Sequence, residues 1–171
     1  MAEGGALLRR YGGECLHRGF ESLLLRLAEL PRVRPSGLTL FRYWSGIGRG
    51  PVYPGLGGSG GHLNALLDTQ YGGRWDGGKV FWYVLPSYRG RVLLRGHRLD
   101  GPQSLGFNGR RLPLRELRIQ PTDTVSWQGQ PLGSRGIPSG VRVLVSGCYG
   151  VQIDGAAFSR TVVFTVDAVS R

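Results

Sequence analysis

GVRVLVSGCYGVQIDGAAFSRTVVFTV, residues 140–166, is the stretch that decides the fold of this chain. Apolar side chains alternate with other residues in three successive runs, over residues 141–145, 149–153 and 158–166. A period of two indicates β-strands. Asp154-Gly155 separates the second and third runs and provides a residue that tolerates positive φ, so we expect a tight turn and a hairpin there. The chain is therefore predicted to end in a β-meander.

Composition extends this interpretation to the rest of the chain. The 171 residues include 30 glycines and 10 prolines, with apolar and aromatic residues between them and no repeating unit. A chain of this length suits one domain and can bury roughly two-thirds of its unfolded surface. We therefore expect short strands joined by many turns.

Further strands are predicted upstream of the meander. Residues 79–85 form a continuous apolar and aromatic run, typical of a central strand buried on both faces. Residues 91–95 alternate as a strand, residues 38–43 give a plausible first strand, and residues 125–127 give a short candidate. Two glycine-rich or proline-rich stretches are predicted as loops, at residues 46–61 and 128–140. A short helical turn could start at His62 to Leu67.

One amphipathic helix is expected, from Cys15 to Leu30, because its apolar residues recur at helical spacing and Pro31 follows. We predict an N-terminal segment with helix and linker at residues 1–35 and a β-domain at residues 36–171. The predicted fold is mainly β, an antiparallel immunoglobulin-like β-sandwich with this one N-terminal helix. A partly open barrel is the alternative.

The chain is strongly basic, with a formal net charge of +11 carried almost wholly by arginine, since Lys79 is the only lysine. Such a balance could attract nucleic acid, an anionic membrane surface or an acidic polymer. However, the excess is spread along the chain without a block of like charges. The simpler interpretation of this arginine excess is a coding bias toward arginine.

Targeting and membrane signals are weak. No segment approaches the ~18 apolar residues of a membrane span. Residues 1–30 contain four glutamates and no apolar run of the ~7 residues that a secretory signal needs, so no export signal is expected there. Two cysteines, Cys15 and Cys148, could form one bridge in an oxidising compartment, and their number alone does not decide the compartment.

Several stretches from residue 46 onward occur in one order: GPVY at residues 50–53, YRGRVLLRGHRLDGP at 88–102, and GCYGVQIDG at 147–155. In this the chain resembles a group of uncharacterised bacterial exported proteins, often predicted lipoproteins, that end in a small immunoglobulin-like β-sandwich. The resemblance implies an extracytoplasmic domain without assigned activity, in which Cys148 pairs with a cysteine near the mature N-terminus, here Cys15. The first 45 residues lack the signal and lipobox of that group, and a chain that starts at Met1 would stay cytoplasmic.

Motifs for catalysis or cofactors are poorly supported. Residues 55–60 have dinucleotide-loop spacing without the strand and helix that the motif requires, and the nucleophile-elbow pattern around Ser59 lacks a parallel sheet. Residues 73–79 lack the hydroxyl that a phosphate-binding loop places after its lysine. The three histidines, His17, His62 and His97, lie far apart without ligands at metal spacing. We expect no catalytic residue, metal or cofactor, and a local hydrogen-bonding role for His97 and Asp100.

The remaining functional candidate is a set of arginines beside aromatic residues. Alternation would place Arg89, Arg91 and Arg95 on one strand face with Arg98 close by, and guanidinium groups bind phosphates and carboxylates. An ordinary solvated strand face is the simpler reading. The sequence thus predicts a non-enzymatic β-sandwich module of a bacterial secreted or cell-envelope protein, in a structural or adhesive role, whose partner could be an envelope polymer or another protein. The alternative is an arginine-rich domain that binds nucleic acid or another polyanion.

Overall fold

The computed structural model describes residues 45–46, 48–56, 62–65, 75–109, 111–124 and 132–168. All regular elements in these ranges are β-strands, so the prediction of a mainly β protein is confirmed. They are β1 (Ser45–Gly46), β2 (Val52–Leu56), β3 (His62–Ala65), β4 (Asp76–Val84), β5 (Val92–Arg98), β6 (Ser104–Phe107), β7 (Glu116–Ile119), β8 (Arg135–Val143), β9 (Gly147–Gly155) and β10 (Phe158–Ala168). None of these ranges holds a helix that could cross a bilayer. The predicted helix at residues 15–30 and the strands predicted at 38–43 and 125–127 lie outside the described residues.

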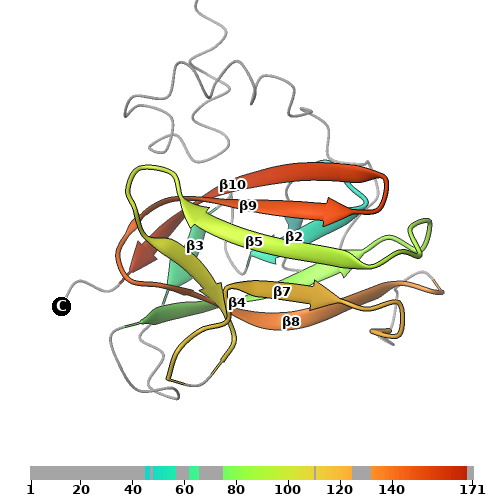
Figure 1. Ribbon diagram of the computed structural model, residues 1–171, viewed down its shortest axis with the longest axis horizontal. Helices are drawn as coiled ribbons and strands as arrows, with labels where there is room; N and C mark the ends of the chain where they lie inside the picture. The colour runs from blue at the N-terminus through green and yellow to red at the C-terminus, as the bar shows by residue number, and fades with distance from the viewer. Residues whose placement is uncertain are drawn as a thin grey trace, which may run out of the picture.

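The strands form one sheet that curls into a half-barrel (Figure 1). Their order is β1-β2-β4-β8-β6-β5-β9-β10-β3, and β7 pairs with β5 beside this path. Neighbours run antiparallel, except that β3 lies parallel to the end of β10. The predicted antiparallel character is therefore confirmed, whereas the finer division into an immunoglobulin-like two-sheet sandwich is not.

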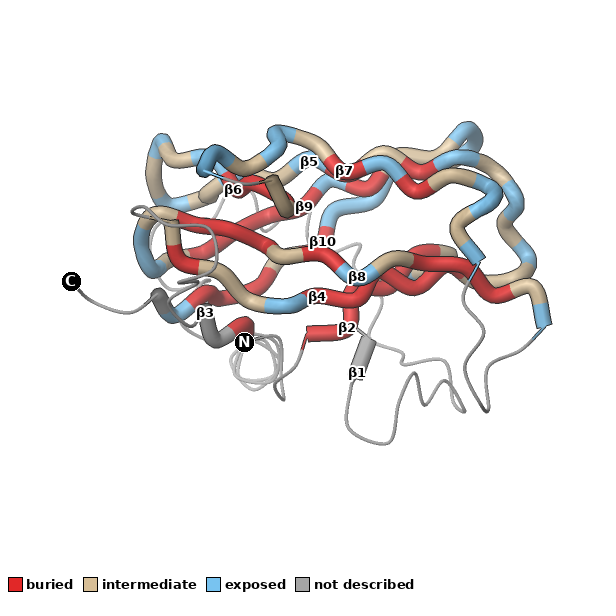
Figure 2. Tube along the Cα trace, turned by 90° about the horizontal axis from the view of Figure 1, so that it is seen from below, coloured by how far each residue is buried: buried red, intermediate tan, exposed pale blue. Residues whose placement is uncertain are grey.

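Strand β6 connects the two halves of the curled sheet. Its first residues pair with β5, Leu105 opposite Gly96, and its last residues pair with β8, Phe107 opposite Val141. Figure 2 shows the result: β5 and β7 lie above β4 and β8, and buried residues line the space between them. The sheet thus folds back over its own apolar face.

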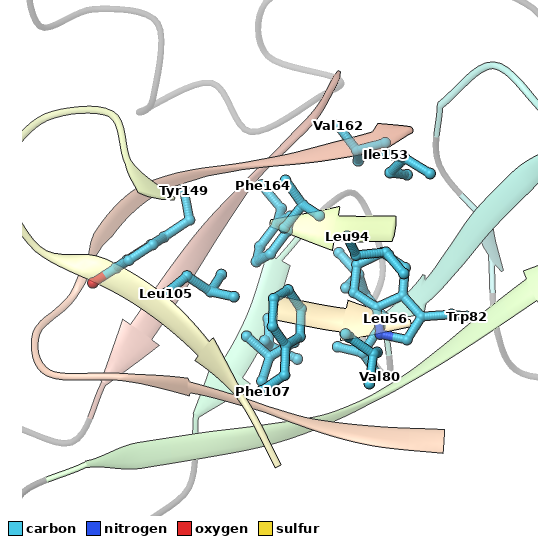
Figure 3. Close-up of a cluster of buried hydrophobic side chains, with 14 of the residues drawn as sticks. Leu56, Val80, Trp82, Leu94, Leu105, Phe107, Tyr149, Ile153, Val162 and Phe164 are labelled. Carbon is cyan, nitrogen blue, oxygen red and sulfur yellow. The ribbon is translucent and has the colours of Figure 1, made fainter. Parts of the chain in front are cut away.

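The core fills this space. Its members come from every strand from β2 to β10, and Figure 3 shows side chains from β2, β4, β5, β6, β9 and β10 gathered between the strands. Trp82 and Phe107 meet edge to face, with ring centroids 6.2 Å apart. Aromatic pairs prefer this arrangement because the positive ring edge meets the negative face of its partner.

Strands β4 and β5 follow the sequence patterns closely. In β4, residues 80–84 are all buried, so side chains on both faces of this strand are shielded from solvent; β4 pairs with β2 on one edge and β8 on the other. In β5, Val92 and Leu94 are buried while Leu93 is half-buried and Arg95 is exposed. The predictions of a central strand and of an alternating strand are both confirmed.

Three segments predicted as irregular or helical contain strands. The loop predicted at 46–61 holds β2, which pairs with β4 over Val52–Leu56. His62–Ala65 pairs with β10 and is not a helical turn. The loop predicted at 128–140 ends early, because β8 already begins at Arg135. Pro138 is tolerated within β8 because, among the described strands, β6 reaches only Val141 and Arg142, so the proline has a partner strand on one side only.

The predicted meander of three runs is wrong, because β8 pairs with β4 and β6 and not with β9. The hairpin between β9 and β10 is confirmed, but its turn is not where the glycine suggested. Gly155 pairs with Phe158, so Ala156 and Ala157 form the two-residue turn and Asp154 belongs to β9. Gly155 is not among the described glycines with positive φ. A Cβ there would overlap the Phe158 ring and lie 2.6 Å from the Tyr88 hydroxyl. The glycine is needed for close packing rather than for the turn.

Candidate functional site

Of the four arginines predicted to bind anions, only two lie in a strand. Strand β5 starts at Val92, so Arg89 and Arg91 belong to the preceding turn, and only Arg95 and Arg98 lie in the strand. Arg89, Arg91 and Arg95 are exposed, and Arg98 is half-buried. Their anion-binding role stays a prediction.

Two of these arginines are already held by carboxylates. Arg95 Nη2 lies 2.8 Å from Asp154 Oδ2, and Arg98 Nε lies 2.7 Å from Asp100 Oδ1. Arg98 Nη1 also donates to Gln103 Oε1 at 2.8 Å. These pairs neutralise half of the predicted cationic set.

Asp154 is the centre of a polar network on the outer side of the sheet. Its carboxylate accepts hydrogen bonds from Ser159 Oγ at 2.6 Å, Arg95 Nη2 at 2.8 Å and Gln152 Nε2 at 2.9 Å. Burial raises the pKa of this carboxyl, but the three hydrogen bonds and the charge of Arg95 outweigh it, so the pKa lies below the ordinary value of 3.8. Asp154 is therefore ionised at neutral pH.

The strand register extends this network into an ordered surface. Arg95 lies opposite both Gln152 and Glu116, Gln152 lies opposite Thr161, and Asp154 lies opposite Ser159. Glu116 in turn pairs with Arg118 at 2.6 Å. We call this surface the polar face; its residues are Arg95, Glu116, Arg118, Gln152, Asp154, Ser159 and Thr161. Sequence reasoning found only Arg95, because cross-strand neighbours are distant in sequence.

The exposed ion pairs of the polar face contribute little to folding. The side chains of Arg95 and Arg118 are 54% and 67% exposed, and pairs in such positions are worth about 0–1 kcal/mol. Their effect is to hold donors and acceptors in place. A surface ordered in this way loses less side-chain freedom when it binds a ligand.

Arg135 is a buried arginine with a different role. It donates to the carbonyl oxygens of Tyr88 at 2.7 Å, Gly90 at 3.0 Å and Gln120 at 3.0 Å. Its guanidinium also lies 5.9 Å from the centre of the Tyr88 ring. Burial lowers the pKa of Arg135, and the nearby charge of Arg89 lowers it further. Sequence reasoning missed this residue because it lies in the segment predicted as a loop, and no local pattern indicates burial.

Tyr88, whose carbonyl accepts from Arg135, connects the β4–β5 turn with the β9–β10 turn. Its hydroxyl donates to Arg91 O and accepts the Ala156 N–H, both at 2.9 Å, and its ring meets Phe158 edge to face. The β4–β5 turn and the β9–β10 turn are thereby tied together. The aromatic residue beside the predicted arginines is thus part of the scaffold.

The residues singled out for other chemistry are placed as follows. Asp100 forms a local ion pair with Arg98 and also accepts the Cys148 N–H from β9 at 3.3 Å. His97 lies exposed on β5, and its local hydrogen-bonding role stays a prediction. Residues 76–79 are part of β4, whereas Ser59, His17 and Cys15 lie outside the described residues. Across the described ranges, no group of His, Cys, Asp and Glu could hold a metal ion. The Cys15–Cys148 pairing stays a prediction, with Cys148 buried in β9 opposite Thr165.

Comparison with known proteins does not add a function. No protein-family model, curated protein or solved structure matches this chain.

Proposed function

We propose that this chain is a non-enzymatic β-sandwich module of a bacterial secreted or cell-envelope protein, which binds a hydroxyl-rich envelope polymer through its polar face. The observation that carries the proposal is the network around Asp154. Carboxylate, amide, hydroxyl and guanidinium groups stand side by side on three strands, and a polysaccharide requires this mixture of donors and acceptors.

The ionisation of Asp154 argues against a role as general acid. A general acid needs a pKa raised toward the working pH, whereas Asp154 has a lowered pKa and three hydrogen-bond donors around it. Such a carboxylate orients its neighbours and accepts hydrogen bonds from a ligand. The proposal therefore assigns it a positioning and binding role.

Co-sedimentation with purified, insoluble cell-wall polymer tests this proposal. The Arg95→Ala variant should lose roughly tenfold or more in affinity, because it removes a donor and releases Asp154. The Lys79→Ala variant is the matched control, because it removes one exposed positive charge from β4, outside the polar face. Absence of sedimentation, or equal loss in the two variants, would refute the proposal.

The immunoglobulin-like sandwich and the Cys15–Cys148 bridge belong to the same proposal. The first is supported by the two layers in Figure 2, and the second by the resemblance to exported proteins. Peptide mapping without reductant should yield one cross-linked peptide pair containing both cysteines. A bridge across so long a loop is worth about 4–5 kcal/mol, so Cys148→Ser should destabilise the oxidised protein by that amount and leave the reduced protein nearly unchanged.

Binding to nucleic acid or another polyanion is the alternative function. Arg89 and Arg91 favour it, because both are exposed and neither takes part in the ion pairs among the described residues. Under this alternative, Arg89→Ala and Arg91→Ala should weaken DNA binding and flatten its salt dependence, with an affinity that falls steeply as salt rises. A wild-type protein that does not bind duplex or single-stranded DNA at low salt would exclude DNA as the partner.

A further inference from the structure

The loop between β6 and β7 exposes two leucines that are separated by one proline. We call residues 111–115 the leucine loop; it projects from the strands ahead of β7 in Figure 1. Leu112 is 73% exposed and Leu114 is 54% exposed. Single exposed apolar residues are common, but two large ones separated only by a proline are a costly arrangement in water.

The leucines are held outward by a rigid backbone. Leu114 and Phe107 exchange two backbone hydrogen bonds of 2.8 Å, although Phe107 itself is in the core. Pro113 packs against Gly106, where any Cβ would overlap the proline ring. Gly109 adopts a φ of 77°, so the chain turns tightly under the carbonyl of Leu112. The fold therefore presents these side chains to solvent in a fixed position.

Arginines flank the two leucines. Arg111 and Arg115 are exposed, and within the described ranges neither belongs to an ion pair. An apolar tip between cationic groups matches one surface chemistry, an anionic phospholipid bilayer, where phosphates lie directly above the acyl region. A protein partner would need an apolar pocket with an acidic rim, so the simpler complement is the lipid surface.

We propose that the leucine loop docks the protein on anionic phospholipid membranes. Leu112 and Leu114 enter the boundary between headgroups and acyl chains, while Arg111 and Arg115 contact lipid phosphates. This role does not depend on the polar face, which has its own ligand and its own test. It gives the module a second surface that holds it against a membrane.

Vesicle co-sedimentation tests the proposal with the full chain. The vesicles contain either phosphatidylcholine alone or an equal mixture of phosphatidylcholine and phosphatidylglycerol. Wild-type protein should bind the mixed vesicles and bind phosphatidylcholine weakly. Leu112→Ser with Leu114→Ser should lower the affinity roughly tenfold or more, and each of Arg111→Gln and Arg115→Gln about fivefold.

The chain offers a matched control for each type of variant. Leu132 is 99% exposed in another loop, so Leu132→Ser makes the same chemical change elsewhere. Lys79→Gln removes one exposed charge from β4, outside the loop. Both controls should bind like wild type. All these side chains are exposed, so the variants should keep the wild-type circular dichroism spectrum.

Three results would overturn the proposal. Wild-type protein that does not bind phosphatidylglycerol vesicles would exclude a lipid partner and leave a protein partner for the loop. Equal loss in the Leu132→Ser control would mean that general surface hydrophobicity drives binding. Loss with the arginine variants but none with the leucine pair would mean that charge alone holds the protein at the surface.

Discussion

The bond between Trp82 and Ser139 provides the sharpest test of the fold. Trp82 Nε1 donates to Ser139 Oγ at 2.8 Å, and the two residues are 0% and 3% exposed. Ser139 lies opposite Val80, two residues before Trp82, so the bond joins diagonal neighbours on the inner side of β4 and β8. A shift of one residue in this register would turn Ser139 to the opposite face.

Ser139→Ala removes the acceptor and leaves a buried indole N–H. The change leaves almost no cavity, so the cost is that of one unsatisfied buried donor, about 1–3 kcal/mol. This is a large share of a typical unfolding free energy of about 5–15 kcal/mol. It corresponds to a fall of about 2–4 °C in Tm for each kcal/mol lost.

Urea denaturation followed by far-ultraviolet circular dichroism measures this cost without relying on tryptophan fluorescence. The double variant Trp82→Phe/Ser139→Ala completes a cycle in which the cavity penalty of the Trp82→Phe change largely cancels, and we expect a coupling energy of about 1–2 kcal/mol. Ser87→Ala, at an exposed serine, is the control and should stay within about 0.5 kcal/mol of wild type. A Ser139→Ala variant as stable as the control, with no coupling, would refute the β4–β8 register.

Three further predictions concern the scaffold and the polar face. Gly136→Ala should abolish or severely weaken folding, by more than about 4 kcal/mol, because the new Cβ would overlap the Trp82 carbonyl in β4. In the control Gly140→Ala, at a half-buried glycine, the new Cβ meets only Asn108 Oδ1 at 3.9 Å, so this variant should fold. A stable Gly136→Ala protein would contradict the packing. Arg135→Met should cost about 3 kcal/mol in urea denaturation, since three carbonyls lose their donor, and a change below about 1 kcal/mol would mean that water replaces the guanidinium. The lowered pKa of Asp154 predicts that its contribution to folding stability is present above the unfolded pKa near 3.8 and is lost as pH falls through the lower folded pKa. Asp154→Asn should therefore be less stable than wild type at pH 7, and this difference in stability should disappear in acid. A difference in stability that does not change with pH would refute the prediction.

The strands could be predicted because their signal is local. Residues 80–84 and 149–153 carry the apolar pattern within a few consecutive residues, and this pattern depends only on which faces are covered. The hairpin of β9 and β10 was predicted for the same reason. Its exact turn was not, because Gly155 responds to contacts with Phe158 and with Tyr88, a residue that is distant in sequence.

The candidate surfaces were predicted only in part. Arg95 was singled out, but its partner Asp154 was assigned to a turn, and Gln152 and Ser159 were not considered. The exposed leucines and their arginines are adjacent in sequence, so the pattern was available there. The sequence did not show that these leucines are exposed, because their exposure depends on whether another strand covers the loop.

The order of residues alone determined that this chain forms short, mainly antiparallel strands with β4 as a buried internal strand, since side-chain alternation and apolar runs are properties of neighbouring residues. Tertiary structure alone decided that β6 joins β5 to β8, that Arg135 lies buried under three carbonyls, and that Asp154 stands beside Arg95. The physical reason is the range of the interactions: strand pairing and the burial of a charge depend on backbone groups many residues apart, and these meet only when the sheet curls over its core.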